Sequence, residues 1–421
     1  MPASLRSFIY FGLSNALMKV LVVIGDSVGR FVAAPDLVTF GRKFQPQSIQ
    51  KSITGLWLTA NHQICTEILK SPNWLSRPLA EKLYQGPSKY DSETIHPFLD
   101  SIIALDGPNQ RRIKKVMHTA FTPDLMQNWK ASSDAVVKKL IQDVTRGSEF
   151  DFVQAFARPL PLEIICEIIG VPLEYKEKCS QWGRVLGGIG LDLPKSNKEL
   201  IQLEEASIGL TSLIAELLEQ RRLQPKNDLL SILANTDSDG ERLTDKEIIA
   251  SASFTLIAGF ETTMNLLSVG TLALLENPDQ LEELIRNPEL VPNFVEEALR
   301  LSSPIQFVVR TADSNQVLSD GTEVRKGQTI ILNLAGANRD PKVFGNPDEF
   351  NIHRENARKN VSFGFGAHHC IGSQLARVEA EALWRALFTA FPDSASWQLA
   401  GEPIYRNTKL IRSLDQLPMR F

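Results

Sequence analysis

One cysteine stands in an unusual setting near the end of the chain. Cys370 lies in residues 363–372, which read Phe-Gly-Phe-Gly-Ala-His-His-Cys-Ile-Gly. Glycines permit positive φ and a close approach of the backbone to another group. A helical pattern begins directly after Cys370, and a helix N-terminus favours a thiolate over a thiol. The segment predicts a thiolate that ligates the metal of a flat, rigid macrocycle, whereas the simpler reading is a buried cysteine in a glycine-rich turn.

The other cysteines carry no comparable signal. Cys65, Cys166 and Cys179 form no CxxC pair, which argues against a zinc site or a redox dithiol. Four cysteines in 421 residues also do not make a disulfide framework. We therefore expect a reducing, cytoplasmic compartment.

A second reactive pair lies at the centre of the longest predicted helix. Thr244 and Glu247 form an S/T-x-x-E capping box that starts this helix, and Pro278 stops it. The helix between them would be about 45 Å long. It is apolar nearly all round, which predicts burial. Buried helices seldom carry a glutamate unless it is paired or functional, so Glu261, followed by Thr262, is a candidate for acid–base chemistry.

Residues 363–372 resemble the haem-binding loop of the cytochrome P-450 superfamily, which has phenylalanine, glycine, a basic residue, cysteine and glycine in this order. Here those positions hold Phe363, Gly366, His368, Cys370 and Gly372. The resemblance implies haem b with the Cys370 thiolate as the axial ligand of its iron, a ligand that promotes O–O cleavage. It also implies that Phe363 shields the sulfur, that His368 contacts a haem propionate, and that Gly364 and Gly366 shape the loop.

Further motifs of the superfamily occur in the same order. Glu297 and Arg300 match its E-x-x-R, and residues three apart on a helix share a face. A surface ion pair is the simpler reading, but the resemblance implies a buried structural network behind the haem. Arg310 resembles the arginine that binds a propionate, because five fixed donors suit a carboxylate. The match covers nearly the whole chain, from about residue 55 onward.

The resemblance assigns Glu261 and Thr262 to an acid–alcohol pair that serves dioxygen. Heterolytic cleavage of O–O takes two protons, so an ionisable group beside a hydroxyl is what the reaction requires. The simpler reading is that Thr262 only donates to a carbonyl of its own helix. Because both residues are present, we expect an enzyme driven by dioxygen and electrons rather than a dedicated peroxide-driven one.

One segment departs from the family pattern. The superfamily commonly has H-x-x-x-R where this chain has Gln110 and Lys114. Gln110 can still donate a hydrogen bond to a propionate, and Lys114 can pair with one, although lysine lacks the bidentate fork of arginine. We expect both to bind the haem, with Arg310 and His368 carrying more of that role.

The same segment suggests a redox partner. Arg111, Arg112, Lys114 and Lys115 place four cations within five residues, on a helix that the resemblance puts near the cysteine loop. A solvated helix face is the simpler explanation, but a basic face would also attract an acidic ferredoxin or flavodoxin. The chain has no G-x-G-x-x-G fingerprint, so electrons would come from such a protein and its reductase. A net charge of -4 gives no argument for nucleic acid.

The substrate is expected to be a hydrophobic small molecule, because the positions that analogy assigns to its pocket are mostly apolar. These positions are Phe254, Ile257, Ala258, Phe307, Val308 and Leu410.

The expected fold is mainly α with a small β subdomain. Helical patterns dominate residues 111–301, short strands with glycine turns fill residues 310–334, and residues 409–421 predict a closing hairpin. The resemblance implies the cytochrome P-450 fold, with the haem between the long central helix and the helix after the cysteine loop.

Two regions are predicted along the chain. Residues 1–34 form an amphipathic extension, because Asn15, Lys19, Asp26 and Arg30 stack along one face of a helix. We expect this helix to pack on the protein rather than lie on a membrane surface. Residues 35–421 form a single haem-thiolate catalytic domain, and we expect a monomer.

The leading hypothesis is a haem-dependent monooxygenase that takes two electrons from a separate partner and hydroxylates or epoxidises its substrate. A peroxygenase or an oxidative coupling enzyme is the alternative within the class. A haem sensor without turnover and a helical binding protein with a buried Cys370 are the alternatives outside it. Glu261 and Thr262 argue against the sensor, which needs no proton relay.

Overall fold

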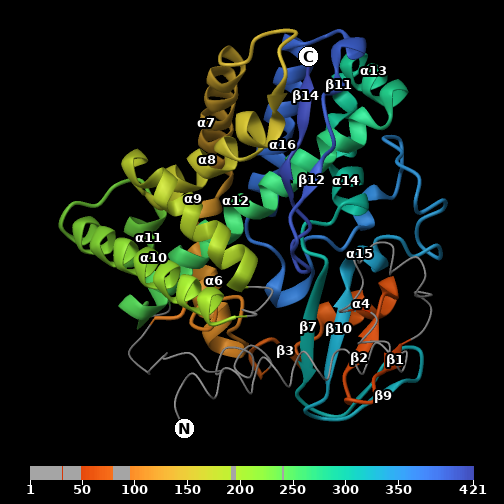
Figure 1. The fold of residues 1–421 in the computed structure, drawn as a ribbon. Coiled ribbons are helices and arrows are strands. Elements are labelled where there is room, and N and C mark those ends of the chain that lie inside the picture. The colour runs from red at the N-terminus through yellow and green to blue at the C-terminus, as the bar shows by residue number, and fades with distance from the viewer. Residues whose placement is uncertain (1–30, 32–48, 79–94, 191–195, 239–240) are drawn as a thin grey trace.

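The computed structural model describes residues 31, 49–78, 95–190, 196–238 and 241–421. These residues form a mostly helical body and several small sheets, as the sequence predicted (Figure 1). The helices are α4 (His62–Lys70), α6 (Gly107–His118), α7 (Pro123–Gln142), α8 (Pro159–Ile169), α9 (Lys176–Val185), α10 (Asn197–Leu223), α11 (Leu229–Asn235), α12 (Asp245–Leu275), α13 (Pro278–Arg286), α14 (Val291–Leu301), α15 (Leu334–Ala337) and α16 (Ser373–Ala390).

The strands are short and gather in small sheets. They are β1 (Gln50–Lys51), β2 (Trp57–Thr59), β3 (Trp74–Leu75), β4 (Phe150–Asp151), β5 (Asp237–Ser238), β6 (Glu241–Arg242), β7 (Phe307–Ala312), β8 (Gln316–Val317), β9 (Glu323–Val324), β10 (Thr329–Asn333), β11 (Gln398–Leu399), β12 (Ile404–Tyr405), β13 (Leu414–Gln416) and β14 (Pro418–Arg420). The largest sheet has the order β1-β2-β10-β7-β3. The predicted turns in this region hold Gly321 and Gly327, both at positive φ.

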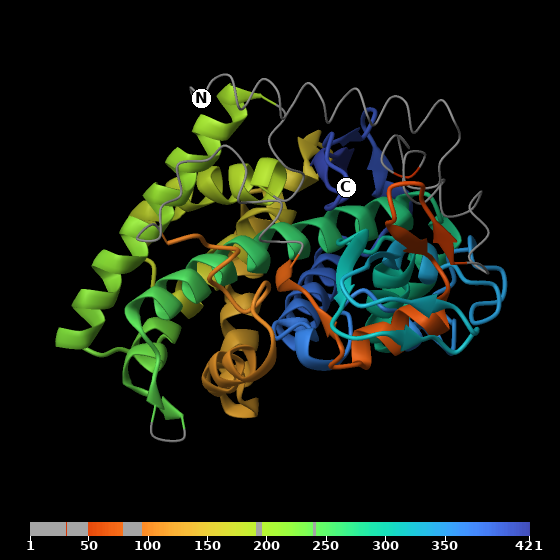
Figure 2. The same ribbon diagram turned by 90° about the horizontal axis from the view of Figure 1, so that it is seen from below.

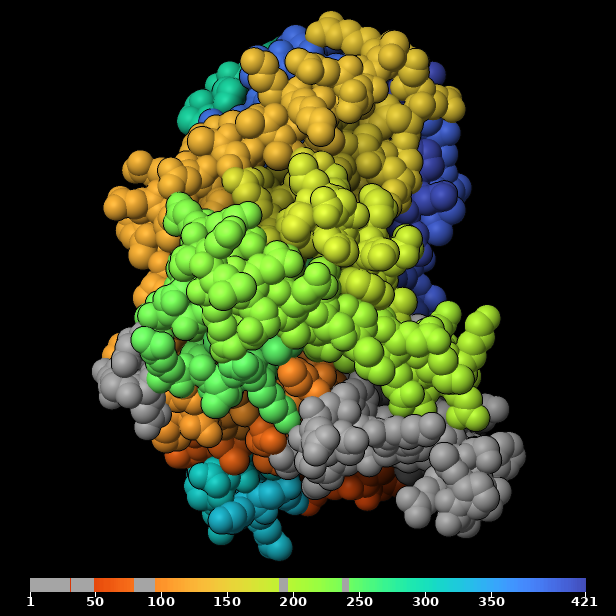
Figure 3. Space-filling model, turned by 90° about the vertical axis from the view of Figure 1, so that its left-hand side faces the viewer, coloured from red at the N-terminus to blue at the C-terminus, as the bar shows by residue number. Residues whose placement is uncertain are grey.

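The predicted long helix is α12, which crosses the molecule (Figure 2). Its capping box is complete: the Thr244 side chain accepts from the Glu247 backbone, and the Glu247 side chain accepts from the Thr244 backbone. The helix is buried along most of its length, as its apolar surface predicted. On one side of the molecule α10 lies across the surface and covers this interior (Figure 3).

The helix that follows Cys370, α16, packs against α7, α12 and α14. It lies close to α12 at Gly270, where a Cβ atom would lie 2.7 Å from the Trp384 ring. The indole N–H of Trp384 donates to the Thr271 hydroxyl over 3.1 Å, so this buried polar atom has a partner. Because α12 and α16 are fixed against each other, the segments at their ends are fixed as well.

The Glu297 and Arg300 pair is fully buried. Arg300 donates to both Glu297 carboxylate oxygens, at 2.7 and 2.8 Å, in a bidentate fork. Arg354 donates to the same two oxygens at 3.1 Å. The remaining donors of Arg300 reach carbonyls at Asn338, Pro347 and Glu349. This network ties α14 to the irregular chain that precedes the cysteine loop.

The tail differs from the predicted hairpin. β13 pairs with β12, whereas β14 pairs with β11 and β4. The two strands therefore belong to different sheets and do not pair with each other. Turn signals and alternation show where strands occur, but they do not show which partner a strand finds when several distant edges are available.

None of the helices formed by the described residues is long and apolar enough to cross a membrane. The expected N-terminal amphipathic helix lies outside the described residues, except for Phe31, which is buried against Phe307.

Candidate functional site

Cys370 lies two residues before Gly372, the N-cap of α16. Its backbone N–H donates to the Phe363 carbonyl over 2.9 Å and closes the loop that the sequence singled out. The Cys370 side chain is exposed, in contrast to Cys65, Cys166 and Cys179, which are buried. The loop therefore presents one accessible sulfur at the start of a buried helix.

Glycine is required in this loop for two reasons. Gly364 and Gly366 have φ of +63° and +67°, which side chains rarely adopt. A Cβ atom on Gly366 would also lie 2.4 Å from the Leu69 carbonyl oxygen, at the end of α4. The backbone of the loop is thus pressed against α4, and a side chain at this position would push it away.

Two side chains of α6 hold the loop from the other side. The Gln110 amide nitrogen donates to the Ala367 carbonyl at 2.8 Å. The Lys114 ammonium donates to the Ala367 and His369 carbonyls at 2.6 and 2.7 Å. The sequence predicted that both residues bind haem propionates, but in the structure these donors are directed to the loop backbone. Their role here is to fix the position of the loop.

The charges around Cys370 act on its thiol in opposite directions. Burial among protein atoms raises the pKa of the Cys370 thiol, although the side chain reaches solvent. The Gly372 backbone N–H, Lys114 and Arg377 act to lower this pKa. These are groups that stabilise a thiolate, and a metal would complete the deprotonation because a coordinating thiol loses its proton.

Arg310 and His368 come together with a residue that the sequence analysis did not select, Asp106. His368 contacts Asp106 through its Nε2 atom over 3.2 Å, and Asp106 also accepts from the backbone N–H groups of Ser76 and Arg77. Arg310 is buried, which lowers its pKa to about 10 against the opposing effect of Asp106. No local motif marks Asp106, because its partners are far along the chain.

The pKa values of this cluster follow from these contacts. Burial raises the pKa of the Asp106 carboxyl, but hydrogen bonds from His368 and from two backbone N–H groups outweigh that effect and hold it below its usual value. Burial lowers the pKa of His368, with Asp106 opposing. The cluster therefore places the Arg310 cation near an imidazole whose charged form is disfavoured and whose ring is oriented by Asp106.

The acid and the alcohol on α12 do not contact each other. The Thr262 hydroxyl donates to the Ala258 carbonyl over 2.7 Å, which is the simpler of the two readings of this residue. The Glu261 side chain is buried, and one of its carboxylate oxygens accepts from Arg406 over 2.6 Å. The other oxygen has no hydrogen-bond partner among the described residues.

Arg406 extends from the tail to Glu261 and is a functional candidate that sequence reasoning missed. Its side chain also donates to Asp415 over 3.0 Å, and Asp415 accepts from Arg184 over 3.1 Å. The side chains of Arg184 and Asp415 are 44% and 33% exposed, whereas that of Glu261 is 1% exposed. A row of alternating charges thus leads from the surface to a buried carboxylate on α12.

The residues predicted to line the substrate pocket lie in different surroundings. Ile257 is buried, Ala258 is half-buried, and the Phe254 ring meets Phe98 edge-on with centroids 6.1 Å apart. Leu410 is half-buried, and its carbonyl accepts from the Gln306 backbone. On α12, Ile257 and Ala258 therefore lie one helical turn before the acid–alcohol pair.

Phe307 and Val308, both predicted to line the pocket, lie on opposite faces of β7. Successive side chains of a strand point to opposite faces, so Val308 and Arg310 share one face of β7 and Phe307 lies on the other. The Phe307 ring contacts Phe31 there, with centroids 5.3 Å apart. Val308 remains a candidate, and it packs in the cluster that includes Phe365 of the loop.

These residues fit a haem with a cysteine ligand. Arg310 is a buried cation that, among the described residues, donates one hydrogen bond, to the neighbouring Val309 carbonyl. It therefore retains donors for a carboxylate group. The glycine loop permits close approach of a flat ring, and Cys370 supplies the sulfur. No group of three or more His, Cys, Asp and Glu side chains suited to a bare metal ion occurs in the described part of the chain.

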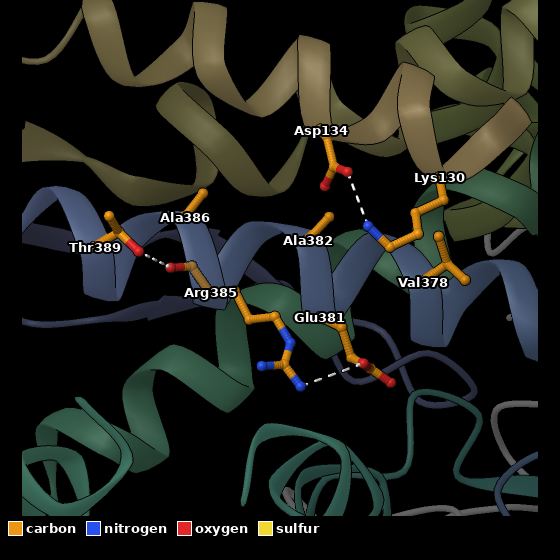
Figure 4. A pocket seen from close by; sticks show the side chains of 8 residues that line it. All are labelled: Lys130, Asp134, Val378, Glu381, Ala382, Arg385, Ala386 and Thr389. Atoms are coloured by element: carbon orange, nitrogen blue, oxygen red, sulfur yellow. Dashed lines mark hydrogen bonds and ion pairs between the residues drawn. The ribbon is translucent and has the colours of Figure 1, made fainter. Parts of the chain in front are cut away.

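A separate hollow of about 300 Å³ lies between α7 and α16 (Figure 4). An ion pair runs along each helix at its rim, between Lys130 and Asp134 of α7 at 2.9 Å and between Arg385 and Glu381 of α16 at 3.9 Å. It contains none of the residues that the sequence selected. This hollow is a feature of the outer surface of α16 rather than of the cysteine site.

Comparison with known proteins identifies this arrangement. The family model for Cytochrome P450 matches residues 192–396. A polyketide biosynthesis cytochrome P450, PksS of Bacillus subtilis (strain 168), is 32% identical over 365 residues, which is 86% of this chain and 88% of that protein. The chain belongs to the cytochrome P450 family.

Two other cytochromes P450 are also similar to this chain. The vitamin D(3) 25-hydroxylase of Pseudonocardia autotrophica is 35% identical over 320 residues, covering 76% of this chain and 77% of that protein. The crystal structure of P450BioI in complex with acyl carrier protein ligated to hexadec-9Z-enoic acid superposes with a TM-score of 0.82 and 31% identity. That match covers 93% of this chain and 99% of the other. The predicted fold class is confirmed, and this chain is a cytochrome P450 monooxygenase.

Asp106 gives a prediction for stability. Replacing Asp106 with Asn removes the charge that accepts from His368 and two backbone N–H groups, so we expect the free energy of unfolding at pH 7 to fall by about 1–3 kcal/mol. Because the folded pKa of Asp106 is depressed, the wild-type advantage is present above the unfolded carboxyl pKa of about 3.9 and is lost as the pH falls through the folded value. Urea unfolding at pH 7 and at progressively lower pH would measure both.

The control is Asp134→Asn, which removes an exposed carboxylate paired with Lys130. Exposed pairs contribute about 0–1 kcal/mol, so this variant should unfold nearly as the wild type does. An Asp106→Asn protein whose stability differs from the wild type equally at neutral and acid pH would contradict the assignment.

Proposed function

We propose that this cytochrome P450 binds haem b through Cys370 and inserts one oxygen atom from dioxygen into a hydrophobic small molecule. In this proposal two electrons come from a separate ferredoxin or flavodoxin with its reductase. The observation that carries the proposal is the accessible Cys370 sulfur in a loop held on both sides, by α4 and by α6. Haem iron with a thiolate ligand supplies the oxygen activation that such a reaction needs.

The side chains around the loop would hold the cofactor. Cys370 would ligate the iron, Arg310 and His368 would bind the propionates, and Phe363 would lie over the sulfur. Asp106 supports this set because it fixes the ring of His368 by accepting from it. Gln110 and Lys114 would act through the loop, since their donors are already directed to its carbonyls.

Proton delivery is assigned to α12. The Thr262 hydroxyl donates to Ala258 at rest, and rotation about its χ1 bond would turn it toward the reacting oxygen. Glu261 would pass protons inward, because it is ionisable and buried and is connected to the surface through Arg406 and Asp415. Arg406 occupies one oxygen of the Glu261 carboxylate, and the other oxygen, which has no hydrogen-bond partner among the described residues, would serve Thr262.

A hydrophobic substrate is supported by the residues near that helix. Phe254, Ile257, Ala258, Val308 and Leu410 offer apolar surface and no charge. The related proteins agree with such a preference, since one is a vitamin D(3) 25-hydroxylase and another was solved with an acyl carrier protein that carries hexadec-9Z-enoic acid. A peroxygenase or an oxidative coupling enzyme remains the alternative.

The cofactor assignment has a direct test. The reduced, carbon monoxide-bound wild-type protein should show the long-wavelength Soret band of a thiolate ligand, and Cys370→Ser should lose that band. Cys65→Ser is the control, because Cys65 is a buried thiol outside the loop. A serine variant at position 370 with an unchanged spectrum would refute the proposal.

Thr262→Ala tests the assignment of dioxygen chemistry. Without the hydroxyl, we expect product formed per electron pair to fall by about 10-fold while oxygen consumption continues, since general acid–base groups contribute about 10²–10⁴-fold. Product formation driven by added peroxide should fall much less. The matched control is Thr263→Ala, because the Thr263 hydroxyl also donates to a carbonyl of the same helix, that of Gly259, over 3.1 Å. Equal coupling in the two variants would contradict the role of Thr262.

The exposed basic surface of α6 contains fewer residues than the sequence suggested. Arg112 pairs with Glu247, and Lys114 is bonded to the loop, whereas Arg111 and Lys115 are exposed on α6. Because α6 contacts the cysteine loop directly, its exposed cations lie beside the expected path of electrons. This position supports docking of an acidic redox protein.

Charge reversal tests this surface. The double variant Arg111→Glu, Lys115→Glu should raise the KM for a ferredoxin by about 10-fold or more at low salt, and the difference should shrink as salt screens the charges. Peroxide-driven turnover should be unchanged. Lys138→Glu, at an exposed position of α7, is the control. A double variant with the same KM as this control would exclude α6 as the docking surface.

A further inference from the structure

Arg377 occupies an unusual position on α16. It lies seven residues after Cys370, one turn into the helix, and its guanidinium carbon is 4.6 Å from the centroid of the Phe363 ring. Phe363 is the residue whose carbonyl accepts from the Cys370 N–H. A cation over the face of an aromatic ring is attracted by the ring quadrupole. Arg377 therefore stacks on the ring of Phe363 and restricts the movement of this residue, which begins the cysteine loop.

A buried carboxylate fixes Arg377 in this position. Arg377 donates to Glu296 of α14 at 2.7 Å, and it donates to the Ser373 carbonyl at 3.0 Å. The Glu296 side chain is 4% exposed, and that of Arg377 is 27% exposed. Asn360 donates to the second Glu296 oxygen at 3.0 Å. The guanidinium thus has a defined place and orientation, unlike an arginine on an open surface.

Arg377 also acts on the sulfur through its charge. Its guanidinium stacks on the ring of Phe363, whose carbonyl accepts from the Cys370 N–H, so the charge lies close to the cysteine loop. Lys114 binds loop carbonyls directly, whereas Arg377 is held by Glu296, whose negative charge opposes its own. The field at the sulfur therefore depends on a balance between one cation and one anion.

We propose that Arg377 and Glu296 form a positioning pair that sets the one-electron reduction potential of the thiolate-bound haem. This inference rests on the proposed function, since it concerns electron transfer to the same site. Arg377 fixes Phe363 over the loop and supplies positive charge, and Glu296 offsets part of that charge. Neither residue touches the reacting atoms.

The electron balance is simple. One electron leaves the reduced iron–sulfur cluster or flavin of the partner and enters the ferric haem, which becomes ferrous. No covalent bond forms or breaks in the protein. The centre gains one negative charge, which a nearby cation stabilises and a nearby anion destabilises. The two members of the pair should therefore shift the potential in opposite directions.

The test compares Arg377→Gln with Glu296→Gln in the haem-loaded protein, by redox titration. Arg377→Gln removes the cation, so we expect the equilibrium constant for reduction to fall by about 3-fold to 10-fold, where tenfold is 59 mV for one electron. Glu296→Gln keeps the size of the side chain and removes the anion, so the constant should rise. A role limited to packing would shift both variants in the same direction or neither.

Two further variants sharpen the comparison. Arg385→Gln is the matched control, because Arg385 lies on the same helix and pairs with Glu381 at the rim of the hollow in Figure 4, with a side chain that is 41% exposed. We expect its potential to match the wild type. Arg377→Lys keeps the charge but lacks the planar fork that bonds to Glu296 and stacks on Phe363, so its potential should lie between wild type and Arg377→Gln.

The results that overturn this inference differ from those that overturn the proposed function. Potentials of Arg377→Gln and Glu296→Gln that move together, or no further than Arg385→Gln, overturn this inference while the proposed function stands. A wild-type protein without the thiolate Soret band overturns the proposed function itself. If Arg377→Gln fails to retain haem, Glu296→Gln alone decides: a higher potential supports the pair, and an unchanged or lower potential refutes it.

Discussion

The position of one backbone loop governs the chemistry of this protein. Residues 363–370 are held by hydrogen bonds from α6 to the carbonyls of Ala367 and His369, and by contact of Gly366 with the end of α4. Carbonyl groups bonded to a buried amide and a lysine cannot shift without losing bonds that would each cost about 0.5–3 kcal/mol. A sulfur carried on such a loop is held in one position by contacts on both α4 and α6.

Three buried glutamates share the way in which their charge is balanced. Glu297, Glu296 and Glu261 are all buried acids, and each is paired with an arginine from another segment or the next helical turn. Breaking such a pair by removing one partner is expensive because the other charge remains buried. The first two pairs stabilise the side of the molecule behind the cysteine. The third joins α12 to the tail and makes no contact with the loop.

The sequence predicted those parts of the site that depend on local order. The capping box of α12, the glycines of the cysteine loop and the Glu297–Arg300 pair are all contained within a few residues, and each has the predicted structure. Asp106, Arg354, Arg377 and Arg406 were missed because their partners are distant in the chain. An isolated arginine or aspartate is common on any surface, and only the fold shows that these four are held against buried groups.

Distant contacts also account for what the sequence left out elsewhere. The pleat of β7 places the adjacent apolar residues Phe307 and Val308 on opposite faces, and their place in a substrate pocket stays a prediction. Gln110 and Lys114 donate to loop carbonyls that no local motif indicates, and their predicted bonds to haem propionates stay a prediction. The tail was predicted to pair with itself, whereas its strands join sheets built from other parts of the chain.

The order of strands in the largest sheet has a consequence for folding. β2 pairs in parallel with β10, at Trp57 with Ile330, and β10 then pairs with β7. Contacts between such distant segments require most of the chain to be brought together first, and the loop entropy is lost before the contact is gained. The helices and the β7–β10 pair can form early from local contacts, but β2 must join this sheet late. A chain arrested before that step would have its helical body and the strand that carries Arg310, and would lack the edge of the sheet that β2 forms with β1.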